Sequence, residues 1–431
     1  MRTRAPVFYG WVVVAIAFVT MGIAVSVRMA FSLLYPELLA EFQWEGGLTA
    51  GAYSLGFLAS TAMLPIVGWA MDRGGPRLVI PVGAGLVAIG LWWVTRVESP
   101  LAFYLSMGLL VINGSMAMSY IVHAMFLPAW FVRNRGFATG VAFAGVGVGA
   151  IVLLPAVQWT VEVHGWRTAC LALAALVVVV IIPLNALFQR GKPADMGLEP
   201  DGGALGAPSR PPIDTVIDPA WAGTEWTLAK ATRTARFWWM CVAQGAGLFA
   251  WYAIQVHQTR LLGEAGFAPG FAATALGLVA FCGIAGQIAI GALSDRIGRE
   301  AAWSLSQLGF VAAALMLVAL TFEPSPWLVW GMVAAQGLLG YGLASLFGAV
   351  IAELFQGARL ASIFAVISLF GNAGAALGAW ALGALHDATG DYTAGFALCA
   401  AAAAVSAVAI WGARPGAVRM TPRRALARAA A

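Results

Sequence analysis

Long stretches of apolar residues, separated by short polar segments, run along the whole chain. A helix needs about 20 mostly apolar residues to cross a bilayer, and its backbone must form its hydrogen bonds within the segment. Twelve such stretches lie at about residues 8–34, 48–70, 78–95, 101–130, 137–160, 167–189, 236–262, 270–292, 301–322, 326–356, 360–383 and 392–413. The pattern predicts an all-α polytopic membrane protein with twelve transmembrane helices. A β-barrel would instead show alternating segments of about 10 residues.

A long polar segment, at residues 190–232 and rich in Pro, Gly and Asp, divides the predicted helices six and six. We expect an N-terminal six-helix half at 1–189, a cytoplasmic linker at 190–232, a C-terminal six-helix half at 233–413 and a basic tail at 414–431. The first apolar run follows the letters MRTR, but it is too long for a signal peptide and lacks a small-residue cleavage site. We interpret it as the first transmembrane helix.

Composition and charge agree with a membrane protein and predict its orientation. Apolar residues make up 61% of the chain and charged residues 10%, which is not the composition of a soluble protein. If both termini are cytoplasmic, most Lys and Arg residues lie on the cytoplasmic side; the exceptions are Arg28, Arg96, Arg167 and Arg260. We expect a multi-pass protein of the cell membrane. The net charge of +5 then reflects this topology and an attraction to anionic membrane lipids, and it does not imply nucleic-acid binding.

Residues that commonly carry catalysis or bind metals form no recognisable pattern in this sequence. The four cysteines lie singly in predicted helices, without the paired spacing of a metal site or a redox motif. The sequence also has no GxSxG motif, no HExxH motif and no Asp-rich metal motif. We therefore predict that the protein is not an enzyme and that it uses no cofactor and no metal.

Two short polar segments repeat each other at about half the chain length. GWAMDRGGPR at 68–77 follows the second apolar run, and GALSDRIGRE at 291–300 follows the eighth. Asp72 and Asp295 are 223 residues apart, as a duplicated six-helix unit predicts. The pattern resembles the cytoplasmic loop motif of the major facilitator superfamily. Its residues here are Gly68, Asp72, Arg73, Arg77, Gly291, Asp295, Arg296 and Arg299.

The residue types in these two loops suit a conformational latch. Gly permits close approach of helices, and Asp can stabilise a helix N-terminus or pair with a neighbouring Arg. We expect the loops to latch the two halves of the protein in one state. The alternative is that the loops carry ordinary cytoplasmic charges. The enrichment of Lys and Arg in cytoplasmic loops would explain the Arg residues, but it would not explain the repeated Gly and Asp.

The segment WFVRNRGFATGVAFAG, at 130–145, resembles the signature of the monocarboxylate transporter family. The matching positions include Trp130, Phe131, Arg133, Arg135, Gly140 and Gly145. The segments 192–202 and 226–239 resemble the central loop of the bacterial branch of this family, which includes oxalate/formate antiporters. Independently of this resemblance, Arg133 and Arg135 follow an apolar run and are interpreted as anchors at the membrane interface. The small residues after them permit close helix packing, either static or sliding.

Few polar residues lie at membrane depth, and several share a face of a predicted helix. On the fourth helix, for example, Tyr120 and His123 are three residues apart, beside one another on the helix surface. The resemblance implies that tyrosines on the fourth and tenth helices contact the substrate, and packing residues are the alternative. The substrate-binding candidates are Arg28, Tyr120, His123, Gln287, Tyr341 and Asn372.

The sequence departs from the family at the residues that usually bind an anion. The resemblance implies an arginine and an aspartate on the eighth helix, where this chain has Gln287 and Gly283, and the eleventh helix has no basic residue. Arg28, inside the first helix, is the cation that remains. It either binds a substrate carboxylate with two charge-assisted hydrogen bonds or extends its side chain to the membrane interface.

No Asp or Glu lies well inside a predicted span, so the candidates for proton coupling are His123 and His257. Each is equally well interpreted as a hydrogen-bonded polar residue without a proton role. We predict a monomeric secondary transporter that moves a small organic anion, a monocarboxylate, by alternating access, with proton coupling left open. The alternatives are transport of a neutral or drug-like solute and a membrane receptor of transporter origin that does not transport.

Overall fold

The computed structural model describes residues 8–44, 46–202 and 215–421, together with 423, 425 and 428. The chain divides into two compact units, Met1–Phe131 with Gly145–Ala207 and Val132–Ala144 with Pro208–Ala431. Helix α8 (Arg135–His164) begins in the second unit and continues in the first. Apart from helices, the described residues include an isolated antiparallel bridge between Val216 and Arg419.

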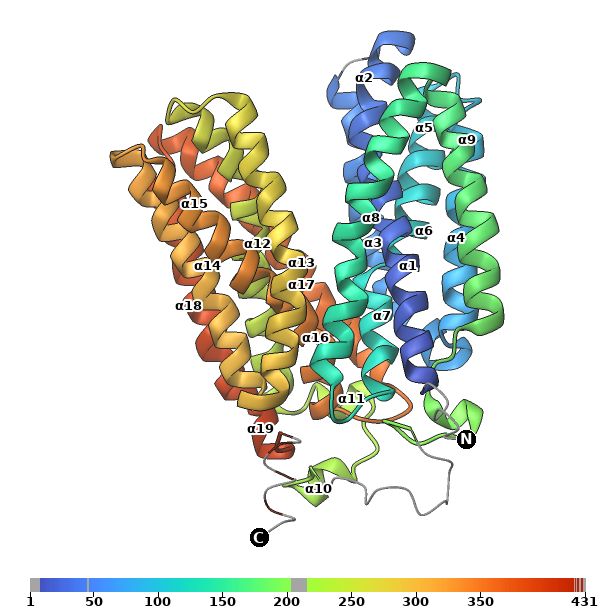
Figure 1. Cartoon of the computed structure of the whole chain (residues 1–431), viewed down its shortest axis with the longest axis vertical. Helices are drawn as coiled ribbons and strands as arrows, with labels where there is room; N and C mark the ends of the chain where they lie inside the picture. Colours follow the sequence, from blue (N-terminus) through green and yellow to red (C-terminus); the bar gives the residue numbers. More distant parts are fainter. Residues whose placement is uncertain are drawn as a thin grey trace, which may run out of the picture. The chain divides into compact units, whose positions relative to one another are not determined.

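The first unit is a bundle of membrane-length helices, some of them interrupted (Figure 1). Helices α4 and α9 lie side by side in it. Besides the later part of α8, its elements are α1 (Tyr9–Met29), α2 (Phe31–Phe42), α3 (Gly46–Gly74), α4 (Pro76–Val94), α5 (Pro100–Phe103), η1 (Tyr104–Ile112), α6 (Asn113–Met116), α7 (Tyr120–Phe126), η2 (Leu127–Ala129), α9 (Trp166–Leu176), η3 (Val177–Ile181), η4 (Leu184–Phe188) and η5 (Pro193–Met196).

The second unit has the same kind of architecture, and in it α14 and α18 lie side by side (Figure 1). Its elements, besides the start of α8, are α10 (Pro219–Ala222), α11 (Leu228–Ala231), α12 (Ala235–Glu264), α13 (Pro269–Ile297), α14 (Arg299–Phe322), α15 (Pro326–Ala334), η6 (Ala335–Leu339), η7 (Gly340–Gly342), α16 (Leu343–Leu354), α17 (Leu360–Thr389), α18 (Thr393–Ala413) and α19 (Pro415–Val418).

Among the described residues, ten helices or helical series are long and apolar enough to cross a membrane. The two other apolar runs of the sequence, 48–70 and 236–262, lie on α3, with 29 residues, and α12, with 30 residues. Large apolar side chains point outward from the bundles, including Leu101 and Val179, each 70% exposed, and Trp327, 83% exposed. Such an apolar surface is what a bilayer covers.

Glycines allow the closest helix contacts in both units. A Cβ atom on Gly145 of α8 would overlap the carbonyl oxygen of Phe18 on α1, and one on Gly374 of α17 would overlap the carbonyl oxygen of Gly245 on α12. Small residues permit this approach of helix backbones inside a membrane. Within the small-residue run after Arg135, Gly145 and Gly149 thus form a packing surface against α1.

Each unit contains a turn at a glycine and a break within a membrane-length helix. Gly75 before α4 and Gly298 before α14 both have positive φ, +63° and +104°, a conformation that glycine adopts without a Cβ clash. The span Pro100–Ala129 contains the π-helical η1 and a break at Ala117, and Pro326–Leu354 contains the π-helical η6 and the 3₁₀ turn η7, which begins at Gly340. Gly75 and Gly298 are 223 residues apart, and so are Ala117 and Gly340; this is also the spacing of the repeated loops.

Candidate functional site

Arg28 lies half-buried in the last turn of α1. Its Nη1 donates a hydrogen bond to Sδ of Met116 on α6, at 2.9 Å. The contact directs the guanidinium toward the interrupted span Pro100–Ala129 of the same unit. A thioether is a weak acceptor and a carboxylate a strong one, so a carboxylate at this position would bind the guanidinium better than Met116 does.

His123 is fully buried on α7, three residues after the half-buried Tyr120. Its Nδ1 lies 3.0 Å from the carbonyl oxygen of Ser119, which can only accept, so Nδ1 carries the proton. Its Nε2 is buried and has no hydrogen-bond partner among the residues that the structure describes. A neutral imidazole satisfies this contact and leaves Nε2 as a nitrogen that can accept a hydrogen bond or a proton.

His257 on α12 has a different environment. Its Nε2 lies 2.9 Å from the carbonyl oxygen of Ala379, and its Nδ1 lies 3.2 Å from the hydroxyl of Tyr392. A neutral ring satisfies both contacts, because Nε2–H donates to the carbonyl and Nδ1 accepts from the hydroxyl. Of the two histidines suggested by the sequence, His257 is fully hydrogen-bonded and His123 is not.

Tyr341 is part of an uncharged polar network in the second unit. Its hydroxyl donates to Oε1 of Gln255 at 3.0 Å, and Nε2 of Gln336 donates to the same oxygen at 3.2 Å. Its ring lies 4.7 Å from that of Trp251. Gln287 on α13 is 3% exposed, and its Oε1 has no partner within the described part of the chain. Asn372 lies half-buried on α17.

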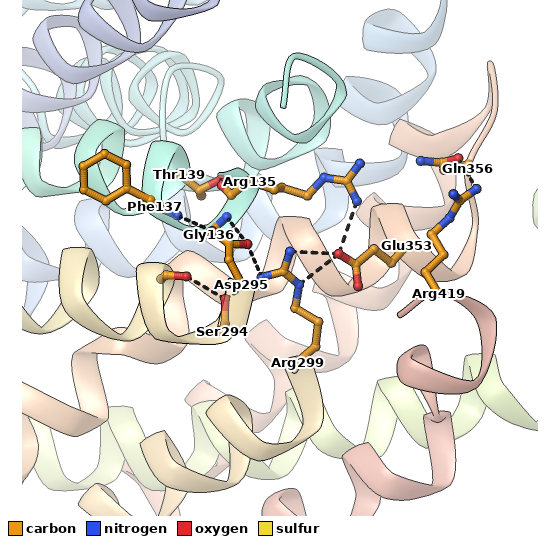
Figure 2. Close-up of polar contacts among 11 residues, drawn as sticks. Arg135, Gly136, Phe137, Thr139, Ser294, Asp295, Arg299, Glu353, Gln356 and Arg419 are labelled. Atoms are coloured by element: carbon orange, nitrogen blue, oxygen red, sulfur yellow. Dashed lines mark hydrogen bonds and ion pairs between the residues drawn. The ribbon is translucent and has the colours of Figure 1, made fainter. Parts of the chain in front are cut away.

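Asp295, at the end of α13, binds the first turn of α8 (Figure 2). Its Oδ1 accepts a hydrogen bond from the backbone N–H of Gly136 at 3.1 Å, and its Oδ2 accepts one from Phe137 at 3.2 Å. These N–H groups belong to the helix start, where they have no partner inside the helix and a negative charge is stabilised. No local sequence pattern indicates this contact, because the partners are 158 and 159 residues apart.

Two arginines and two carboxylates complete this arrangement, which we call the ion cluster: Arg135, Asp295, Arg299 and Glu353 (Figure 2). Arg299 Nη1 lies 2.9 Å from Asp295 Oδ1, and Arg299 Nη2 lies 2.8 Å from Glu353 Oε1. Arg135 Nη1 reaches the same oxygen of Glu353 at 3.3 Å. The four side chains are 5–12% exposed, and their charges cancel. In the sequence, Glu353 stands out only as an acidic residue near the end of an apolar run.

A sequence model of the Major Facilitator Superfamily matches residues 14–261 and 251–429. The chain belongs to the Major Facilitator Superfamily. Monocarboxylate transporter 13 of Rattus norvegicus is 28% identical over 396 residues, which cover 91% of this chain and 86% of that protein. Monocarboxylate transporter 11 of Mus musculus is 28% identical over 416 residues, with 91% and 84% coverage.

Two solved structures of this superfamily have a similar fold. A variant of the E. coli fucose:proton symporter superimposes with a TM-score of 0.68 over 95% of this chain and 99% of that chain, at 16% identity. The proton:xylose symporter XylE gives 0.66, with 94% and 95% coverage and 12% identity. The predictions of an all-α major facilitator fold with two six-helix halves and of a transporter that is not an enzyme are confirmed.

The other loop and signature residues of this superfamily member occupy several environments. In the first unit, the Arg73 guanidinium lies 4.3 Å above the Trp69 ring, and Arg77 donates twice to the carbonyl oxygen of Ala186, at 3.0 and 2.8 Å. Trp130 Nε1 donates to the carbonyl oxygen of Arg190 at 3.2 Å. The remaining loop and signature residues are Phe131, against Trp11; Gly68, buried; Asp72 and Arg133, half-buried; Gly291, against Gly136; Gly140, against Gln287; and Arg296, exposed.

The Tyr341 ring also lies against Gly283, where the family resemblance implied a different residue. A Cβ atom on Gly283 would lie 2.5 Å from Cδ1 of the Tyr341 ring, so the ring fills the place of a side chain there. The resemblance implied an aspartate at this position. The tyrosine ring and an aspartate cannot both occupy this space. Among the described residues, no group of three or more His, Cys, Asp or Glu side chains could hold a metal ion.

Proposed function

We propose that this transporter moves a small monocarboxylate across the cell membrane by alternating access. The observation that carries the proposal is the position of Arg28, a half-buried cation in the last turn of α1 whose Nη1 contacts Met116 of the interrupted span Pro100–Ala129. A carboxylate would form paired hydrogen bonds with the guanidinium, each worth about 1.5–3 kcal/mol. The names of the relatives that match 91% of the chain support the same substrate class.

In the proposed binding step, the Tyr120 hydroxyl donates a hydrogen bond to the substrate carboxylate, and His123 accepts a proton at Nε2. Protonation next to an arriving anion balances the charge that the anion brings into a low-dielectric site. Proton coupling through His123 follows from this step. The other substrate-binding candidates, Tyr341, Gln287 and Asn372, all belong to the second unit and are uncharged.

In the proposed conformational step, the ion cluster is the latch. It binds the first turn of α8 to α13 and α16, and α8 continues into the other unit. Breaking and re-forming the cluster would therefore accompany any rearrangement of α8. The excess of Lys and Arg in the predicted inner loops supports a cytoplasmic position of the cluster and of both termini.

Transport of a neutral or weakly polar solute is the second candidate. It is favoured by the uncharged network of Tyr341, Gln255 and Gln336 and by Gln287, which stands where the resemblance implies an arginine. In that case Arg28 would serve as an interfacial anchor and not as a binding residue.

Uptake into proteoliposomes distinguishes the two candidates. Labelled monocarboxylates, a dicarboxylate and a neutral amide are offered to the wild type, to Arg28→Gln and to the control Arg96→Gln, which removes an arginine stacked on Trp92 at a helix end. We expect saturable monocarboxylate uptake that Arg28→Gln abolishes and Arg96→Gln retains. Equal uptake by all three proteins, or uptake of the neutral amide alone, would contradict the proposal.

A further inference from the structure

A tryptophan of the linker caps the helix that carries Glu353. Trp221 lies in α10, and its indole Nε1 donates to the carbonyl oxygen of Leu354 at 2.6 Å, across 133 residues of sequence. Leu354 is the last residue of α16, whose final carbonyl groups have no partner inside the helix. Trp221 therefore supplies a donor where α16 lacks one, directly beside Glu353.

The Trp221 side chain is fixed on several sides. The Arg236 guanidinium lies 4.1 Å from the ring centroid, and the Trp226 ring lies 4.4 Å away. The backbone N–H of Trp221 donates to Asp218 Oδ1 at 2.9 Å, and its carbonyl oxygen accepts from Trp226 Nε1 at 3.2 Å. An indole held in this way pays little conformational entropy to form its hydrogen bond with Leu354.

The same aromatic group is anchored in the core of the second unit. The Trp226 ring packs edge-on against Phe355, with centroids 5.2 Å apart. Trp226 is 7% exposed and Phe355 is fully buried. Phe355 follows Leu354 and has left the helical conformation, with φ −131° and ψ 53°. The linker thus contacts α16 at the residue where the helix ends and at the residue after it.

We propose that Trp221 is a positioning residue for the ion cluster: by capping Leu354 it holds the end of α16 so that Glu353 bridges Arg135 and Arg299. The linker is then a part of the latch and not only a connection between halves. This inference rests on the latch proposed above. Loss of one neutral hydrogen bond changes an equilibrium by about fivefold, which is the expected effect of removing the indole donor.

A buried cysteine reporter on α8 measures opening of the cluster. Thr139 is 1% exposed, and its hydroxyl donates to the carbonyl oxygen of Arg135, so Thr139→Cys places a small thiol one turn from the cluster. The background replaces the natural cysteines by alanine. The rate of maleimide labelling is measured on the purified full chain in detergent, which gives the reagent access from every side.

We expect Trp221→Phe, which keeps an aromatic ring but loses the donor, to raise the labelling rate about fivefold. Trp238→Phe is the matched control, because its indole also donates to a backbone carbonyl, that of Thr232, at 2.9 Å, but does not hold α16. Glu353→Gln should also raise the rate. Adding Trp221→Phe to Glu353→Gln should raise it no further, because the residue that Trp221 positions has already lost its charge.

Each other outcome contradicts a defined step. An unchanged rate in Glu353→Gln would overturn the latch itself. A raised rate in Glu353→Gln with no change in Trp221→Phe would overturn this inference alone, as would additive effects of the two changes. If Trp221→Phe does not fold, Trp226→Phe removes the donor that holds the Trp221 carbonyl oxygen, and the absence of any rise in that variant overturns the inference.

Discussion

A single oxygen of Glu353 binds the Arg299 guanidinium through two nitrogen atoms, Nε at 2.9 Å and Nη2 at 2.8 Å. The same oxygen also accepts from Arg135. Glu353 therefore bridges two buried cations, and Arg299 also pairs with Asp295, the other acid of the cluster.

Replacing this carboxylate should destabilise the protein. We expect Glu353→Gln to lower the free energy of unfolding by about 2 kcal/mol, because it leaves excess buried positive charge on the arginines. Thermal unfolding in detergent measures the effect. Glu323→Gln, at the exposed end of α14, is the control and should unfold like the wild type. Equal midpoints for wild type and Glu353→Gln would show that the cluster is not a stabilising contact.

Replacing Arg28 with lysine should preserve transport only in part. Lysine keeps the positive charge but cannot form the paired, planar hydrogen bonds of a guanidinium with a carboxylate. We expect Arg28→Lys to transport the monocarboxylate with KM raised about tenfold, the equivalent of roughly 1.4 kcal/mol. Met116→Leu, which removes the sulfur at nearly constant volume, should leave KM unchanged. If Met116→Leu raised KM more than Arg28→Lys does, the contact between Arg28 and Met116 would be needed for binding, and the hydrogen-bonding geometry of the guanidinium would not.

The two histidines should differ in proton coupling. His123 has a buried, bare Nε2 among the described residues, whereas both nitrogens of His257 are hydrogen-bonded. We expect an inward proton gradient to stimulate uptake by the wild type and by His257→Gln. His123→Gln should lose this stimulation but retain exchange of substrate at equal pH on both sides. Undiminished stimulation in His123→Gln would remove that residue from the proton path.

Glu41 should make the stability of the first unit depend on pH. Its oxygens accept hydrogen bonds from Arg167 at 2.5 and 2.7 Å and from Trp166 at 2.7 Å. The hydrogen bonds from Arg167 hold the pKa of Glu41 below its usual range. A carboxyl with a lowered folded-state pKa stabilises the protein above its unfolded-state pKa, about 4.3, and loses this contribution as the pH falls through the folded value.

The measurement is the unfolding midpoint of the wild type and of Glu41→Gln from pH 7 to pH 3. The wild type should unfold at the higher temperature at neutral pH, and the difference should shrink below about pH 4. The effect is modest because the Glu41 side chain is 39% exposed. Glu37→Gln removes an exposed charge from the same helix and serves as the control. A difference that grows as the pH falls would contradict the assignment.

Gly283 should not accept the aspartate that the family resemblance implies at this position. The Tyr341 ring occupies the space of a Cβ atom at Gly283, so Gly283→Asp should reduce the yield of folded protein. Combining it with Tyr341→Ala frees this space and should restore part of the yield. Normal folding of Gly283→Asp alone, judged by size-exclusion chromatography, would mean that the ring moves aside freely.

Much of the fold could be predicted from the sequence because a bilayer imposes a simple length and polarity rule on each helix. The breaks at Ala117 and Gly340 could not, since they lie within apolar runs that look continuous. The repeated loops identified Asp295 and Arg299 through local residue spacing. Their partners, Gly136 and Glu353, are brought to them by packing of distant segments, which no local pattern encodes.

The left-handed glycines Gly75 and Gly298 occupy matching positions in the two repeated loops. After the first, Arg77 holds a backbone carbonyl, and after the second, Arg299 joins a charge cluster. The side-chain contacts differ between the two loops, whereas the main chain bends at a positive-φ glycine in both. The repeated segments are therefore more alike in their backbone torsion angles at these glycines than in the contacts of their charged side chains.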